Sequence, residues 1–184
     1  MTEWIIDAIR VNIPLLTLLV HVVLGVFFLV FLGSQLTGIK QLRTWFLALH
    51  SWWSQHATHV AFFFSLAAML GSLFYSDVLG YTPCLLCWYQ RIFMYPIVFL
   101  CGYGLYRNEA KTVLRYVRVL AIPGALIAAY HYYTQVFTVA TTCGLEGGCN
   151  VAYSFHYGYI TIPLMALTAF VGIIISTYAH KNRP

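Results

Sequence analysis

The chain has 184 residues, of which 61% are hydrophobic and only 8% are charged, and its formal net charge is +5. A soluble domain carries about 25% charged residues, so this composition excludes an ordinary soluble globule. The basic residues lie mostly beside long apolar runs, where membrane topology and anionic lipid favour them. We therefore expect contact with membrane lipid and no nucleic-acid binding.

Five apolar segments are each close to the roughly 20 residues that a membrane-spanning helix needs. They run approximately Val11–Leu32, Ala57–Leu79, Leu85–Tyr106, Val113–Tyr133 and Tyr157–Tyr178. The first has no basic region before it and no small-residue cleavage site after it, so we interpret it as a retained span and not as a signal peptide. The sequence therefore predicts an all-α, polytopic membrane protein.

Another helix is predicted between the first two spans, over Lys40–His56. Its apolar residues recur at the spacing of an amphipathic helix, and they include Trp45, Trp52 and Trp53. Tryptophan on the apolar face is typical of a helix that lies in the membrane interface, although a simple extension of the second span is the alternative. We therefore divide the chain into an N-terminal extension, residues 1–56, and a main membrane domain, residues 57–184.

Lysine and arginine predict the orientation of the spans. They cluster before the second span, between the third and fourth spans and in the C-terminal tail, whereas residues 76–83 and 134–156 contain none. By the positive-inside rule, those two connections lie outside and the C-terminus lies inside. Five spans then place the N-terminus outside, although Arg10 weakly opposes this.

Four of the five cysteines fall in the two outer connections. Cys84 and Cys87 form a C-x-x-C motif where the third span begins, and Cys143 and Cys149 flank a glycine-rich stretch in the last outer loop. The extracytoplasmic side is oxidising, so disulfides form and persist there. Cys101 lies inside the third span, where we expect it to pack as a small apolar residue.

The surroundings of the C-x-x-C motif favour thiolate chemistry. Thr82 is a candidate N-cap and Pro83 suits the first helical position, which would put both thiols in the opening turns of a helix. The free N–H groups and the positive dipole end of a helix stabilise a thiolate at that place. Arg91 shares the helical face of both cysteines. An arginine inside a membrane helix is energetically costly, and a thiolate or an anionic ligand beside it would account for its presence.

Other interpretations of the cysteines remain open from the sequence. A C-x-x-C motif can be half of a zinc site, but the outer connections offer only His131 and His156 as histidine ligands, and the second cysteine pair is spaced too loosely. Either pair could be a static disulfide. A two-residue gap is, however, typical of a pair that exchanges, and a glycine-rich loop lets a partner's thiolate reach the second pair. We therefore predict redox chemistry and no metal.

The residues around the motif resemble a known family. Residues 83–96, which read Pro-Cys-Leu-Leu-Cys-Trp-Tyr-Gln-Arg-Ile-Phe-Met-Tyr-Pro, are similar to the disulfide bond formation protein B family (DsbB), and most similar to the branch that includes the BdbC proteins of Gram-positive bacteria. Ala129–Tyr133, Ile160–Pro163 and the short second cysteine pair also resemble that branch. The resemblance extends over about residues 57–179.

This resemblance implies a four-helix bundle in the bacterial cytoplasmic membrane that reoxidises a DsbA-like thioredoxin-fold thiol oxidase on the extracytoplasmic side. It also implies that the electrons pass to a quinone, ubiquinone or menaquinone. Carried over by position, the resemblance implies that Cys84 and Cys87 are the quinone-proximal pair, with Cys87 contacting the quinone and Arg91 polarising a quinone oxygen. It implies that Cys143 and Cys149 are the pair that meets the partner.

Two histidines in the spans are of interest. His131, near the outer end of the fourth span, is a candidate for contact with the quinone or for proton transfer, and equally for a packed histidine. His21, alone in the first span, is expected to pack or to form a hydrogen bond between helices.

Three features depart from the family pattern. The N-terminal extension is outside the four-helix fold, Gln90 stands where some members have an acidic residue, and the second cysteine pair is closer together than in the best-known members. The cysteines also leave open a thiol relay in the reducing direction, or a transporter or scaffold with structural disulfides.

Overall fold

The computed structural model describes residues 2–36, 40–137, 149 and 154–181. In chain order, the elements are α1 (Thr2–Leu36), α2 (Lys40–Gln55), α3 (Ala57–Leu73), the π-helical turn η1 (Phe74–Val78), α4 (Leu85–Arg107), α5 (Ala110–Val136) and α6 (Ile162–Lys181). Among the described residues, five helical stretches are long and apolar enough to cross a membrane. The predicted all-α, polytopic fold is therefore confirmed.

The last span begins later than the sequence predicted. Its helix starts at Ile162 and not at Tyr157, because a tight turn occupies the preceding residues. Tyr157 and Gly158 have φ angles of 53° and 79°, and His156 pairs with Ile160 across the turn. A left-handed backbone cannot continue a right-handed helix, so this aromatic run is a turn and not the start of a span.

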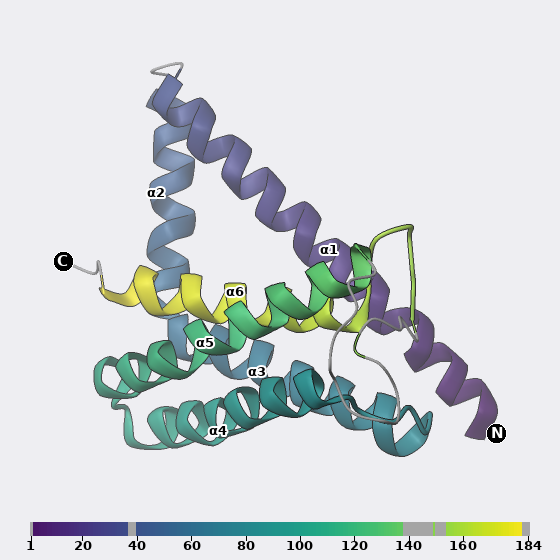
Figure 1. The fold of residues 1–184 in the computed structure, drawn as a ribbon. Helices are drawn as coiled ribbons and strands as arrows, with labels where there is room; N and C mark the ends of the chain where they lie inside the picture. The colour runs from purple at the N-terminus through teal and green to yellow at the C-terminus, as the bar shows by residue number, and fades with distance from the viewer. Residues whose placement is uncertain (1, 37–39, 138–148, 150–153, 182–184) are drawn as a thin grey trace.

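Helices α3 to α6 form a four-helix bundle in which α3 packs on α4 and α6, and α5 packs on α4 and α6 (Figure 1). Its core contains Ile97 of α4, Val117 of α5 and Ile173 of α6, all fully buried. α5 and α6 are in close contact at Gly124, where a Cβ would collide with the buried ring of Phe170. Small residues allow such contacts in a bilayer, where dispersion contacts contribute much of the helix packing.

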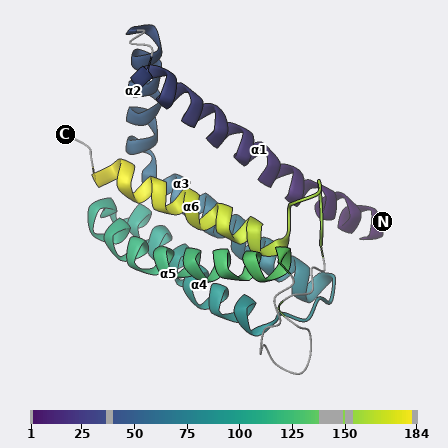
Figure 2. The ribbon, with the colours of Figure 1, turned by 45° about the horizontal axis from the view of Figure 1, so that its top comes forward.

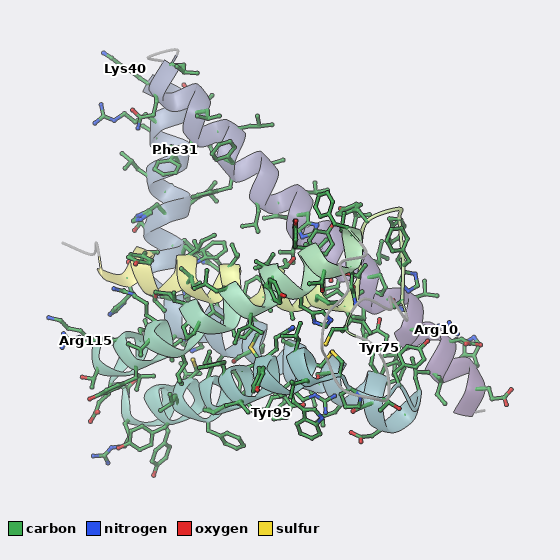
Figure 3. The ribbon with its side chains drawn as sticks, viewed as in Figure 1. Arg10, Phe31, Lys40, Tyr75, Tyr95 and Arg115 are labelled. Atoms are coloured by element: carbon green, nitrogen blue, oxygen red, sulfur yellow. The ribbon has the colours of Figure 1, made fainter. Side chains whose placement is uncertain are left out.

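The bundle has one end that is richer in positive charge. Arg115 lies toward the end of the bundle where the chain terminates, and the connection between α4 and α5 at this end also carries Arg107 and Lys111, whereas Tyr75 and Arg10 lie toward the opposite end, near the N-terminus (Figure 3). Lys40 lies away from the bundle, at the start of α2 (Figure 3). The start of α4 and the end of α5 are also at this second end (Figure 1). The arrangement agrees with the positive-inside argument, and the side of the membrane on which each end lies stays a prediction.

α1 and α2 form a hairpin that extends beyond the bundle (Figures 1 and 2). The ring of Phe46 in α2 lies 5.3 Å, between centroids, from the rings of both Phe27 and Phe31 in α1. Trp53 of α2 donates a hydrogen bond from Nε1 to the Ser176 hydroxyl of α6, at 3.1 Å. These contacts attach α2 to both α1 and the bundle.

α2 is a separate helix and not a straight continuation of α3. The two helices meet at His56, where the chain changes direction (Figure 2). Trp45 and Trp52 of α2 remain largely exposed, as expected for side chains that contact lipid. The simple extension of the second span is therefore wrong, and the interfacial position of α2 stays a prediction.

His21 connects α1 to the bundle. Its Nε2 lies 2.7 Å from the Thr168 hydroxyl of α6, and its Nδ1 lies 3.2 Å from the Tyr159 hydroxyl. Thr168 donates its own proton to the Leu164 carbonyl, so it accepts from His21 Nε2–H, and Nδ1 accepts from Tyr159. The predicted hydrogen bond from His21 to another helix is confirmed.

Candidate redox site

The helix that carries the C-x-x-C motif begins at Leu85, with Cys84 as its N-cap. The expected N-cap at Thr82 and helical position of Pro83 are therefore wrong. Cys84 has an extended backbone, with φ −71° and ψ 171°, and its Sγ accepts the backbone N–H of Cys87 at 3.4 Å. The sulfur takes the place of a capping oxygen because the first N–H groups of a helix have no partner inside it.

This cap brings the two sulfurs of the motif together. Cys84 and Cys87 are free thiols whose Sγ atoms lie 3.2 Å apart. The hydrogen bond from the Cys87 thiol lowers the pKa of Cys84 to about 4, against the opposing effect of burial. His131 and the backbone N–H of Cys87 lower it further. Cys84 is therefore the thiolate of the reduced pair at neutral pH.

His131 of α5 lies between Cys84 and the second predicted pair. Its side chain is 1% exposed, and its Nε2 is 3.6 Å from Cys84 Sγ and 3.1 Å from the Cys149 carbonyl oxygen. A carbonyl only accepts, so Nε2 carries a hydrogen. Nδ1 lies 2.9 Å from Gln90 Nε2, whose amide N–H donates to it. His131 thus shares its one N–H between the Cys149 carbonyl oxygen and the more distant Cys84 sulfur.

Cys149 is disulfide-bonded and almost fully buried. Its expected partner, Cys143, lies outside the described residues. Since His131 contacts both Cys84 and the backbone of Cys149, the structure brings one member of each predicted pair to the same histidine.

Arg91 is held against α3. Its Nε donates to the Ser72 hydroxyl at 2.9 Å, and Nη2 donates to the Ser72 carbonyl at 3.1 Å. The guanidinium also lies over the Trp88 ring, 5.2 Å from its centroid. Just after Ser72, α3 widens into the π-helical turn η1, a feature that is frequent at functional sites.

A pocket of about 480 Å³ opens beside these groups. Cys84, Cys87, Arg91 and His131 all line it, and most of its other lining side chains are apolar. An apolar pocket with a few converging polar groups is typical of a small-molecule or cofactor site. Four of the predicted site residues therefore lie around one pocket: Cys84, Cys87, Arg91 and His131. Cys101 lies apart from them, in the bundle core.

The same residues form a possible metal-binding group. The ligand atoms of Cys84, Cys87 and His131 lie within 4.8 Å of one another, and these are ligand types that zinc prefers. The sequence offered no second pair of zinc ligands near the C-x-x-C motif. The fold supplies one additional ligand, His131. The Nε2 that faces the thiols, however, carries the hydrogen donated to Cys149, which favours thiolate stabilisation over metal binding.

Two residues of the site were not expected from the sequence. Gln90 orients His131, and Ser72 orients Arg91. Both are polar residues within otherwise apolar spans, and such residues usually face the interior of a bundle. That signal was present in the sequence, but it does not name the partner of either residue.

The low pKa of Cys84 predicts a pH dependence. Above that pKa the thiolate predominates, so reduced protein is expected to show thiolate absorbance in the ultraviolet down to about pH 5. Replacing His131 with leucine removes a donor, raises the pKa of Cys84 and moves this titration to higher pH. The Cys101→Ala variant is the control and keeps the wild-type curve. An unchanged curve in His131→Leu would contradict the role given to the histidine.

Comparisons with known proteins agree with the family resemblance found in the sequence. The family described as "Disulfide bond formation protein DsbB" matches residues 54–170. "Disulfide bond formation protein C" of Bacillus subtilis is 43% identical over 114 residues, which cover 60% of this chain and 82% of that protein. "Probable disulfide formation protein C 1" of Bacillus cereus is 35% identical over 133 residues, which cover 70% of this chain and 95% of that protein.

A third relative, "Probable disulfide formation protein" of Oceanobacillus iheyensis, is 42% identical over 112 residues, covering 59% of this chain and 77% of that protein. No solved structure matches the chain. The family match begins at residue 54, near the junction of α2 and α3, and ends at residue 170, so it contains α3 to α5 and the first part of α6 and leaves α1 and nearly all of α2 outside.

Proposed function

Because the chain belongs to the DsbB family, we propose that it is a membrane thiol:quinone oxidoreductase that reoxidises a DsbA-like thioredoxin-fold protein. Family membership and the five apolar helices make it a multi-pass membrane protein of disulfide bond formation. The proposal adds the thiol partner, a ubiquinone or menaquinone acceptor, and the extracytoplasmic side of a bacterial cytoplasmic membrane for both cysteine pairs.

The observation that carries the proposal is the contact of His131 with both Cys84 and Cys149. A relay requires the loop pair to come close enough to the C-x-x-C pair for a direct attack of sulfur on sulfur. A disulfide that only staples the loop has no such requirement. The buried position of Cys149 beside His131 therefore supports exchange between the pairs.

The proposed relay consists of two exchanges and one oxidation. A partner thiolate attacks the Cys143–Cys149 disulfide, and the partner leaves oxidised while both cysteines become thiols. One of these two cysteines, as the thiolate, attacks the Cys84–Cys87 disulfide. This exchange restores the Cys143–Cys149 disulfide and leaves Cys84 and Cys87 reduced. Cys84 and Cys87 then form their disulfide again, which releases two electrons and the proton of the Cys87 thiol. A quinone would serve as the two-electron acceptor, and its second proton would come from solvent because Cys84 is already a thiolate.

The residues of the chain contribute to these steps in different ways. The low pKa of Cys84 makes it a good leaving group when its disulfide is attacked, and the N–H of His131 stabilises the departing thiolate. Arg91 places a fixed positive charge on the pocket, where it can stabilise negative charge on an acceptor oxygen. The apolar remainder of the pocket suits an acceptor that is dissolved in lipid.

The experiment uses the purified protein with a reduced thioredoxin-fold partner and a soluble quinone analogue. We expect catalytic oxidation of the partner only when the quinone is present, with equal molar amounts of quinol and partner disulfide formed. Oxidation without any dependence on quinone would contradict the proposal. Reduction of an oxidised partner by added quinol, with no forward reaction, would instead identify a relay in the reducing direction.

A further inference from the structure

Helix α1 lies outside the region that matches the family, yet it lines the pocket beside the C-x-x-C motif. Five of its residues form this part of the lining: Ile9, Ile13, Leu16, Thr17 and Val20. The remaining walls come from residues of the family region, mainly in α3, α4 and α6. The pocket therefore has one wall that the four-helix bundle does not supply.

The surface that α1 presents to the pocket is apolar. Ile13 faces Gly71 of α3, because a Cβ built on that glycine would lie 4.0 Å from Ile13 Cδ1. Thr17 is buried, and its hydroxyl donates to the Ile13 carbonyl at 3.1 Å within the helix. Val20 is partly buried, whereas Val23, one turn further along the same helix, is 59% exposed and does not line the pocket.

A polar contact holds this wall in place. His21 follows Val20 directly and forms the hydrogen bonds to Thr168 and Tyr159 described above. Such bonds stabilise the packing of membrane helices and fix which faces meet. They orient α1 so that Ile13 and Val20 point toward the pocket.

The pocket consequently has two chemically different parts. Cys87 and Arg91 supply a thiol and a positive charge at one part, while α1 supplies only apolar surface at the other. An occupant that suits both parts has a polar, electron-accepting head and a long apolar chain. We propose that α1 is the wall that binds the apolar tail of the quinone, and that Ile13 and Val20 determine the affinity for tailed acceptors. This inference rests on the proposed function.

Binding measurements on the full-length protein test the inference without relying on turnover. The two probes are a decyl-substituted quinone and the same quinone ring without the tail, each titrated at equilibrium in detergent. Val20→Ala removes buried apolar area and is expected to weaken binding of the decyl quinone by roughly 3- to 10-fold, with the tail-less quinone unaffected. The matched control, Val23→Ala, should leave both dissociation constants unchanged.

Ile13→Trp provides a second variant that fills the pocket. It is expected to weaken binding of the decyl quinone more than Val20→Ala does, because the larger ring occupies the space of the tail. In the wild-type protein, a quinone with a photoreactive group at the end of its tail should label peptides of α1.

Three results would overturn the inference: equal affinity of Val20→Ala and Val23→Ala for the decyl quinone, no effect of Ile13→Trp, or labelling confined to α3–α6. These results differ from a failure of the proposed function itself. In that case the wild-type protein would bind neither quinone, and the tail-less probe would not be reduced.

Discussion

Replacing Cys87 with alanine is expected to lower quinone-dependent turnover by a factor on the order of a thousand or more, while one equivalent of reduced partner is still oxidised. The expected loss is large because Cys84 cannot form a disulfide without the sulfur that lies 3.2 Å away. The single equivalent remains because the second pair, which contains Cys149, can still exchange once with the partner. Rapid mixing followed by acid quenching and thiol labelling would measure both quantities.

Two further variants complete this test. Cys149→Ala should oxidise no partner at all, neither in the first turnover nor in later ones, because the second pair can no longer form its disulfide. Cys101→Ala changes a cysteine on the same helix as Cys87 but in the bundle core, and it should turn over as the wild-type protein does. Wild-type turnover in Cys87→Ala would contradict the relay.

Replacing Arg91 with glutamine is expected to lower kcat/KM for the quinone by a factor on the order of a hundred, about 3 kcal/mol. The variant removes the fixed positive charge that lies on the pocket beside Cys87. The first exchange with the partner does not involve this charge, so the amount of partner oxidised in the absence of quinone should stay the same. Steady-state kinetics at varied quinone concentration would measure the loss.

The bundle contains a matched control for Arg91. Arg118 of α5 donates from Nε to the Thr177 hydroxyl and from Nη2 to the Thr177 carbonyl, and it lies over the Tyr178 ring. This geometry resembles that of Arg91 with Ser72 and Trp88, but it lies away from the pocket. Arg118→Gln should therefore leave the quinone kinetics unchanged. Equal losses in both arginine variants would mean that Arg91 acts only by attaching α4 to α3.

The parts of the fold that depend on local sequence were predictable. The length of each apolar run predicted the five spans, and the tryptophan pattern predicted α2 as a helix. The spacing of Cys84, Cys87 and Arg91 predicted that they share one side of a helix, and all three line the same pocket, with Cys84 as the N-cap of α4. These predictions succeed because helical periodicity and bilayer thickness act on each segment separately.

The parts that depend on contacts between distant segments were not predictable. The sequence could not choose between a reactive and a packed His131, because its neighbours come from two distant segments, the start of α4 and the part of the chain that contains Cys149. The N-cap prediction failed because it relied on residue type. Thr82 is the stronger capping residue by type, but the backbone conformation at Cys84 places a sulfur at the start of the helix. No periodicity could indicate that α1 lines the pocket.

The hydrogen bonds between Arg91 and Ser72 also have a consequence for biogenesis. α4 is the least apolar of the five spans, and an unpaired arginine within it opposes its insertion as a single helix. Ser72 lies in α3, which is synthesised immediately before α4 and is joined to it by a short connection. The two helices can therefore leave the translocon as a paired hairpin, in which α3 already solvates the charge that α4 brings into the bilayer.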